Sequence, residues 1–170
     1  MPIDSCQHTF EQLAAKVLPD HFERLEAAIK QPIAATSLSA MKSASKAALK
    51  VIDREKDFSG CYVFLSEAKP VYVGISRTIV RRLVQHLNTE SHFSASLVYR
   101  MASGDYPHEM KRDQAMKDDL FQKVFVESQQ RLRAMSFAFV EIDNDLELYL
   151  FEAYAAMKFD TSKWNTFRTH

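Results

Sequence analysis

Two short runs decide the fold: Ser59-Gly60-Cys61-Tyr62-Val63-Phe64 and Val71-Tyr72-Val73-Gly74-Ile75-Ser76. Both are rich in β-branched and aromatic residues, a composition that is typical of strands. The residues Glu67-Ala68-Lys69 lie between them. We therefore predict an antiparallel hairpin with this three-residue connection, in which Ser66 lies opposite Pro70.

Side-chain alternation along this hairpin sorts its residues onto two faces. One face is apolar and carries Cys61, Val63, Leu65, Val71, Val73 and Ile75. The other face carries Tyr62, Phe64, Ser66, Tyr72, Gly74 and Ser76. A slip of one residue would move a tyrosine into the apolar row, so the pattern itself predicts that Tyr62 and Tyr72 share a face. Ordinary cross-strand packing is the alternative role for such a pair.

A helix from Thr78 to Leu87 is predicted next, because its apolar residues recur at helical spacing. Arg82 and His86 are four residues apart and should lie together on this helix, beside the apolar stripe. A guanidinium and an imidazole near two tyrosines and a glycine would suit a phosphate group. A solvated polar face is the alternative.

A second predicted helix runs from Asp145 to Lys158, and Glu152 is the only charged residue between Glu147 and Lys158. A carboxylate with apolar neighbours needs a cation or hydrogen-bond donors to remain ionised. Glu152 is therefore either a metal ligand or the partner of an arginine such as Arg82.

The order of these polar residues resembles the signature of the GIY-YIG endonuclease family. The resemblance covers about 59–88 and 136–167 and rests on Gly60 with Tyr62, Tyr72 with Gly74, Arg82 with His86, Glu152, and Asn165. The isoleucines of the family are replaced by Cys61 and Val73. Both positions lie in the apolar row, where small hydrophobic residues substitute readily.

The resemblance implies a DNA endonuclease that hydrolyses phosphodiester bonds with one divalent cation, Mg²⁺ or Mn²⁺. It implies that Glu152 is the metal ligand and that Arg82 contacts the non-bridging phosphate oxygens. Tyr62, or failing that Tyr72, would be the general base, and His86 would orient or deprotonate it. Asn165 would fix the geometry of the site by hydrogen bonding. A restriction-type or stand-alone repair nuclease is the expected kind.

The remaining sequence completes an α+β domain with a small, mainly antiparallel sheet of three strands flanked by helices. We predict a third strand at 136–142 and helices at 10–17, 22–29, 37–52, 94–101 and 109–133. Residues 1–57 form a helical N-terminal extension in this interpretation. Residues 58–170 form the GIY-YIG-like module, with an insertion at about 88–134.

The charge of the chain is balanced, with 22 Lys and Arg against 22 Asp and Glu. Non-specific affinity for nucleic acid comes largely from phosphate neutralisation, so any DNA binding must depend on local charge. Lys42, Lys46 and Lys50 recur every fourth residue, which would align them along one side of a helix. A basic rim around the site is expected from Arg77, Arg81, Lys163 and Arg168.

Cys6 and Cys61 are too few for a disulfide framework or a zinc ribbon, and they are expected to be reduced thiols. No secretory segment and no apolar run long enough to span a membrane is recognisable, so a soluble cytoplasmic protein is expected. Two alternatives to the nuclease remain open. One is a non-catalytic nucleic-acid-binding module, and the other is a protein-interaction domain that docks a partner on 109–133. The extension could also serve dimerisation, which leaves a homodimer open.

Overall fold

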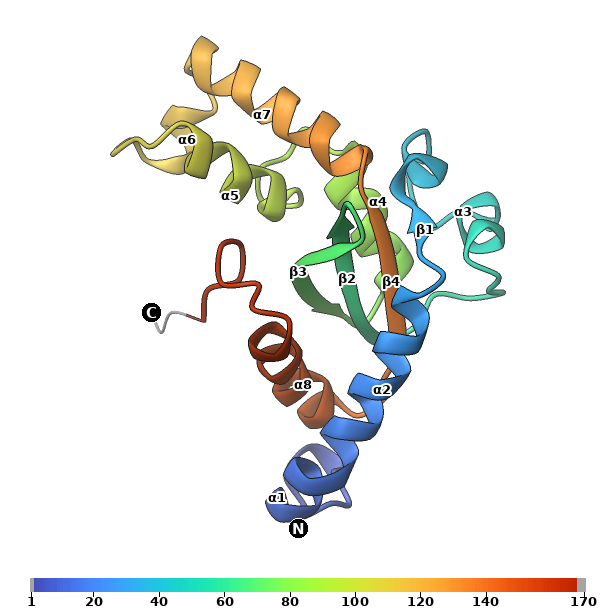
Figure 1. The fold of residues 1–170 in the computed structure, drawn as a ribbon. Coiled ribbons are helices and arrows are strands. Elements are labelled where there is room, and N and C mark those ends of the chain that lie inside the picture. The colour runs from blue at the N-terminus through green and yellow to red at the C-terminus, as the bar shows by residue number, and fades with distance from the viewer. Residues whose placement is uncertain (1, 168–170) are drawn as a thin grey trace. The chain divides into compact units, whose positions relative to one another are not determined.

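The structure, a computed structural model, describes residues 2–167 of the chain (Figure 1). The strands are β1 (Ile33–Ala34), β2 (Gly60–Ser66), β3 (Lys69–Ser76) and β4 (Ser136–Glu141). The α-helices are α1 (Phe10–Gln12), α2 (Leu18–Ile29), α3 (Lys46–Val51), α4 (Ile79–Asn88), α5 (Ser96–Asp105), α6 (Arg112–Ala115), α7 (Asp119–Arg133) and α8 (Asp145–Lys158). Short 3-10 turns at Ile3–Ser5 and Ala35–Leu38 and a π-helical turn at Leu13–Val17 complete the elements.

The described chain forms two compact units that interleave along the sequence. The first unit contains the chain up to Ile33, then Lys56–Ile79, then the part from Ser136 onward. The second unit contains Ala34–Glu55 and Val80–Met135. The predicted division into extension, module and insertion stays a prediction.

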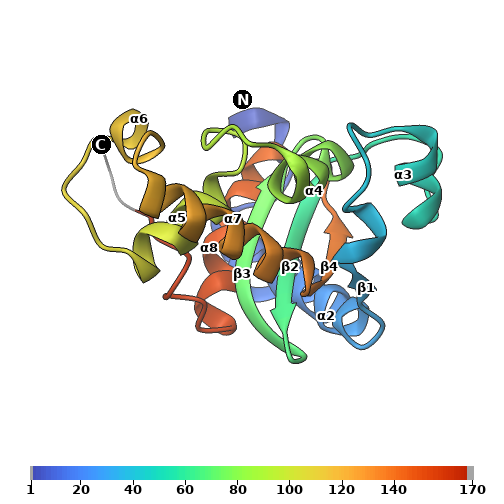
Figure 2. The ribbon, with the colours of Figure 1, turned by 90° about the horizontal axis from the view of Figure 1, so that it is seen from above.

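Within residues 2–167 the strands form one four-stranded sheet in the order β1-β4-β2-β3, and β4, β2 and β3 are visible side by side in Figure 2. Both neighbours of β2 run antiparallel to it. The three predicted strands are confirmed, and the expected count of three was wrong because of β1. That strand has only two residues, which is too short to show a periodic pattern.

The hairpin has the predicted register around the tyrosines but a different turn. Tyr62 lies opposite Gly74, and Phe64 lies opposite Tyr72, as expected. The connection, however, is the two-residue loop Glu67-Ala68, whose positive φ angles of 50° and 63° suit a type I′ turn. A bulge after Phe64 inserts one extra residue in β3 and restores the register.

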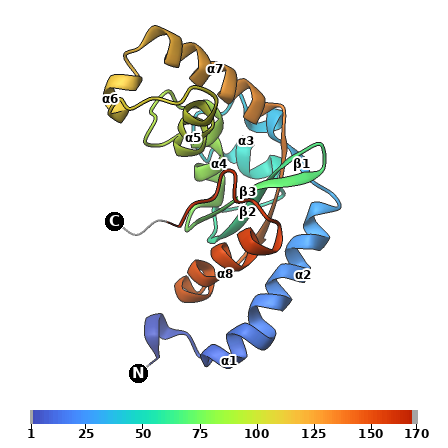
Figure 3. The ribbon, with the colours of Figure 1, turned by 60° about the vertical axis from the view of Figure 1, so that its left-hand side comes forward.

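The apolar face of the hairpin forms the core of the first unit, as predicted. Cys61, Val63 and Val73 are fully buried there. Helix α8 packs on this face of β2 and β3 and α2 packs mainly on β4 beside it, and Figure 3 shows both helices on the same side of the sheet. They contribute Leu25 from α2 and Phe151 from α8 to the core. Burial of this apolar surface is the main force that holds the helices on the sheet.

The N-terminal helices run together, whereas the sequence predicted a break at Pro19. Thr9 begins the run with a capping box to Gln12, and the helix continues to Ile29. Proline normally clashes with the carbonyl four residues earlier. Here the π-helical turn at Leu13–Val17 ends two residues before Pro19 and contains Ala15, the residue four before the proline, so the wider turn accommodates the proline ring.

Two predicted helices of the second unit are shorter in the structure. The helix expected at 37–52 begins only at Lys46, because Ser45 caps α3 by accepting a hydrogen bond from the Ala48 N–H. The helix expected at 109–133 begins at Asp119, where Asp118 caps α7 by accepting from the Phe121 N–H. Serine and aspartate compete with helix formation except at such caps, so these side chains mark starts.

Candidate functional site

The tyrosine face of the hairpin is a packed aromatic layer in the first unit. The rings of Tyr62 and Tyr72 lie 6.2 Å apart between centroids, and Tyr62 also meets Phe64 edge-on at 5.9 Å. Tyr62 is 1% exposed and Tyr72 is 8% exposed. The shared face predicted for the tyrosines is thus confirmed, and both hydroxyls are held on rigid strands.

Gly74 lets the Tyr62 ring approach the backbone of β3. A Cβ atom at residue 74 would lie 2.5 Å from both Cζ and Oη of Tyr62, and 2.9 Å from Tyr72. Any side chain here would displace both rings, since real Cβ atoms do not make such contacts. The Tyr-x-Gly spacing in β3 therefore has a steric reason in this chain.

Asn165 fixes the backbone between Tyr72 and Gly74. Its Oδ1 accepts a hydrogen bond from the Val73 N–H at 2.9 Å, and its Nδ2 donates to the Val73 carbonyl at 2.7 Å. Strand β3 is at the edge of the sheet, so the outward N–H and carbonyl of Val73 have no neighbouring strand to pair with. The buried Asn165 amide takes the place of that strand.

Glu152 lies on α8, which packs against β2 and β3. Its carboxylate is partly buried and interacts electrostatically with the thiol of Cys61. Complete burial, together with this nearby carboxylate, raises the pKa of the Cys61 thiol well above its usual range. Cys61 is therefore a neutral core residue, and Glu152 lies close enough to influence it.

Arg82 and His86 lie on α4 in the second unit and differ in exposure. Arg82 is half-buried and donates from Nη1 to the Ser94 carbonyl at 2.9 Å and from Nη2 to Ser96 Oγ at 2.8 Å. His86 is 0% exposed, although the sequence placed it beside the apolar stripe. Burial, followed by repulsion from Arg82 and Arg100, lowers the pKa of His86 well below its usual range. The imidazole is consequently neutral at pH 7.

The predicted lysine stripe is broken in the structure. Lys42 lies in an irregular segment before α3, while Lys46 and Lys50 are exposed on α3 itself. Lys42 instead lines a pocket together with Arg81. The roles of Lys46 and Lys50 in DNA binding stay predictions.

Arg77 and Lys163, two other basic residues expected around the site, each contact a different neighbour. Arg77 forms a two-bond ion pair with Asp145, which neutralises much of its charge. The Lys163 ammonium lies 4.7 Å from the centre of the Trp164 ring. Arg168 lies outside the described residues.

A polar cluster in the first unit was missed by the sequence analysis. The Glu147 carboxylate lies 3.1 Å from His21 Nε2 and 3.6 Å from His8 Nε2, and Cys6 Sγ is 3.9 Å from it. Cys6 and His8 are near one another in the sequence, but His21 and Glu147 are distant from them at no recognisable spacing, so no sequence signal could have found the cluster. In residues 2–167, no group of three or more His, Cys, Asp or Glu side chains is arranged to hold a metal ion.

None of the helices in residues 2–167 has the length and apolar character to cross a membrane.

Comparisons with known proteins agree with the motif. The family model of the GIY-YIG catalytic domain matches residues 58–160. A crystal structure of the GIY-YIG N-terminal endonuclease domain of UvrC from Thermotoga maritima, a point mutant bound to its catalytic divalent cation, is similar at 16% identity with a TM-score of 0.40. The match covers 72% of this chain and 99% of that chain. A search of curated proteins gave no match.

Proposed function

Since the chain belongs to the GIY-YIG family, we propose that it is an endonuclease that hydrolyses DNA phosphodiester bonds with one divalent cation, Mg²⁺ or Mn²⁺. The observation that carries this proposal is the hairpin in which Gly74 admits the Tyr62 ring and Asn165 binds the Val73 backbone. Three signature residues thereby have a physical reason to occur together.

A tyrosine is the proposed general base for the attacking water. The sequence favoured Tyr62, but a base must exchange its proton with water, and Tyr62 is 1% exposed against 8% for Tyr72. Tyr72 also lies on the edge strand, where Asn165 fixes the neighbouring residue. We therefore assign the base to Tyr72 and a packing and orienting role to Tyr62.

Glu152 is the proposed protein ligand of the cation. Mg²⁺ usually takes only one or two carboxylates and keeps water and phosphate oxygens in its remaining positions, so a single half-buried carboxylate fits it. The cation, when bound, supplies Lewis-acid stabilisation of the phosphate charge. The partly apolar environment of Glu152 leaves its carboxylate with little water around it. A bound cation would therefore stabilise the negative charge of this carboxylate.

Arg82 is the proposed contact to the non-bridging phosphate oxygens, and Ser94 and Ser96 would hold its guanidinium in position. His86 is neutral and buried, so we propose that it orients neighbouring groups rather than carrying charge. Arg77 contributes little to DNA attraction in this proposal, because Asp145 pairs with it.

The direct test is incubation of supercoiled plasmid and short duplexes with the protein in Mg²⁺ or Mn²⁺, with and without chelator. Nicking that the chelator abolishes supports the proposal. DNA binding without such nicking would instead favour the non-catalytic module. Methylation-sensitive cutting at fixed sequences would indicate a restriction-type enzyme, and cutting only beside lesions would indicate a repair nuclease.

Glu152→Gln separates the metal ligand from a structural ion-pair partner. As a metal ligand, Glu152 acts through the cation, so Glu152→Gln should abolish nicking and leave the melting temperature in chelator largely unchanged. As a structural partner, its loss should cost about 3 kcal/mol of stability. Glu127→Gln, an exposed change on α7, is the control. Retained nicking with a large fall in melting temperature would overturn the assignment.

A further inference from the structure

A pocket of about 670 Å³, with both apolar and polar lining, lies in the second unit along one side of α4. The residues that line it include Lys42, Ser43, Arg81, Gln85, Thr89 and Ser94. Those of α4 and its C-terminal end follow helical spacing, so they form one continuous strip of the helix surface. Lys42 and Ser43 come from the segment before α3 and close the pocket from the other side.

The lining of the pocket carries positively charged side chains, although the chain as a whole has no net charge. Lys42 and Arg81 contribute two cations, and its lining, all of it within the described part of the chain, contains no Asp or Glu. Ser43 and Thr89 carry hydroxyl groups that can donate hydrogen bonds to an anion. Two cations with hydroxyl donors are the groups that contact phosphate in protein–DNA complexes.

The segment that carries Lys42 is held against α4 by a half-buried side-chain amide. Asn88 Nδ2 donates to the Leu38 carbonyl at 2.8 Å and to the Met41 carbonyl at 2.7 Å. Lys42 directly follows this fixed point, so its position relative to Arg81 is defined by the fold. Asn88 is thus a positioning residue for the pocket.

The pocket also adjoins the proposed phosphate-contacting arginine. Ser94 lines the pocket, and its carbonyl accepts the hydrogen bond from Arg82 Nη1. Arg81 and Arg82 are neighbours on α4, one directed to the pocket and the other to Ser94 and Ser96. A phosphate chain that reached Arg82 would therefore pass close to Lys42 and Arg81.

We propose that this pocket binds a backbone phosphate of the DNA substrate other than the one that is hydrolysed. The proposal rests on the proposed nuclease function and adds where the DNA is held. Lys42 precedes the matched family range, which begins at residue 58, so the wall of the pocket that carries Lys42 lies outside the match to the family domain. It should supply affinity and leave the chemical step unaffected.

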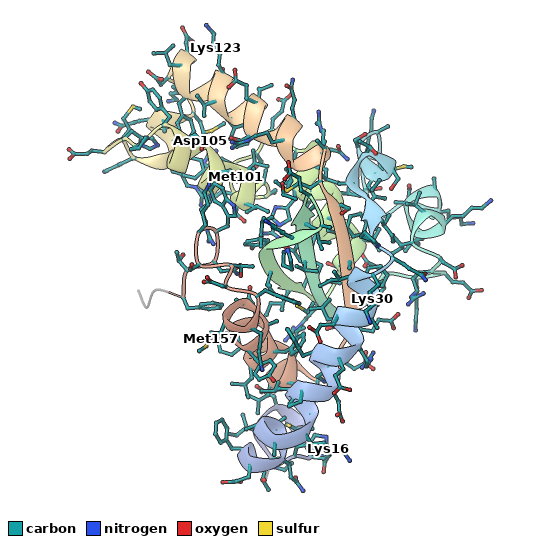
Figure 4. All side chains as sticks on the ribbon, in the orientation of Figure 1. Lys16, Lys30, Met101, Asp105, Lys123 and Met157 are labelled. Carbon is teal, nitrogen blue, oxygen red and sulfur yellow. The ribbon has the colours of Figure 1, made fainter. Side chains whose placement is uncertain are left out.

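The test compares Lys42→Gln/Arg81→Gln with a control of equal charge, Lys117→Gln/Lys123→Gln. Both control lysines are exposed and lie outside the pocket, and Lys123 is labelled on α7 in Figure 4. Binding of a fluorescent duplex is measured over a range of salt concentrations, and cleavage is measured under steady-state conditions. The pocket variant should lower the slope of log affinity against log salt by about two units, while the control should not. Its KM should rise by about tenfold or more, with kcat unchanged.

Asn88→Ala provides a second variant that removes no charge. It should release the Lys42 segment and raise KM in the same direction, with Lys42 and Arg81 both present. If the unaltered protein cuts DNA and the pocket variant behaves like the control, the pocket proposal is overturned and the nuclease stands. If the unaltered protein neither binds nor cuts DNA, both proposals fall. A fall in kcat with unchanged KM would also refute the assigned role.

Discussion

Asn165→Ala tests whether a buried side-chain amide holds the edge of the sheet. The change removes both hydrogen bonds to Val73, and Val73 is fully buried, so its N–H and carbonyl lose their partners together. A buried backbone group left unsatisfied costs about 1–3 kcal/mol, and entry of water at the edge strand reduces the sum for two groups to about 2–4 kcal/mol. For a chain of this size that corresponds to a fall in melting temperature of about 5–15 °C.

Asn165→Ala should loosen β3 to a greater extent than it destabilises the protein as a whole. Hydrogen exchange of the Val73 amide should accelerate in Asn165→Ala well beyond the change expected from the lower stability alone. Nicking should weaken as well, because Tyr72 and Gly74 flank Val73. Asn165→Asp keeps one acceptor but sets a carboxylate oxygen against the Val73 carbonyl, so its stability should improve as the pH falls and the carboxyl protonates.

Thr166→Ala is the matched control, since Thr166 is the next residue and is exposed. It should leave the melting temperature, the Val73 exchange rate and nicking unchanged. Equal Val73 protection in Asn165→Ala and the unaltered protein would refute the view that the amide replaces a neighbouring strand.

Three further outcomes are expected. Arg82→Ala should reduce the single-turnover cleavage rate by several orders of magnitude. Ser96→Ala removes one hydrogen-bond partner of the guanidinium and keeps its charge, so it should lower this rate by about tenfold. An unchanged rate in Arg82→Ala would remove Arg82 from the mechanism. The pKa of His86 is depressed in the folded protein, so the unfolded chain takes up the proton first. The contribution of neutral His86 to folding stability is then fully present above a pH of about 6.5 and is lost as the pH falls below that value. The urea midpoint of unfolding should therefore fall with pH in the unaltered protein but not in His86→Gln. A pH dependence that persists in His86→Gln would contradict the assignment. Glu67→Asn/Ala68→Gly should raise the unfolding free energy by about 1–2 kcal/mol in calorimetry, because both residues have positive φ; no gain would mean that the turn stores no such strain.

The sequence predicted those parts of the fold in which local pattern and tertiary packing agree. The register of β2 and β3 followed from alternation, because only one pairing keeps Cys61 and Val63 in one apolar row. The turn was wrong because Glu67-Ala68 lacks the Asn-Gly chemistry that marks type I′ turns. The bulge then compensated for the shorter loop, so an incorrect turn left the tyrosine pairing correct.

The candidate site was harder to predict from the sequence where it depends on contacts between residues that are distant in the chain. The burial of His86 is set by packing that its own helix does not reveal, so a polar position was a reasonable expectation. Lys42 appeared to belong with Lys46 and Lys50 by spacing, but the helix starts only after the Ser45 cap, and Lys42 lies before it, near Arg81. Asn165 was predicted to hydrogen-bond, and its partner, the Val73 backbone, could only be found in the folded chain.

The position of β4 in the sheet has a consequence for folding during synthesis. Strand β2 pairs with β3 almost immediately, but its other neighbour, β4, follows only after most of the second unit has left the ribosome. Until then the hairpin presents an unpaired edge and an uncovered apolar face, which are the features that promote association between chains. Long-range pairing of this kind also slows folding. We therefore expect nascent chains that end before Ser136 to aggregate, and chains that extend through α8 to close the sheet on both sides of β2.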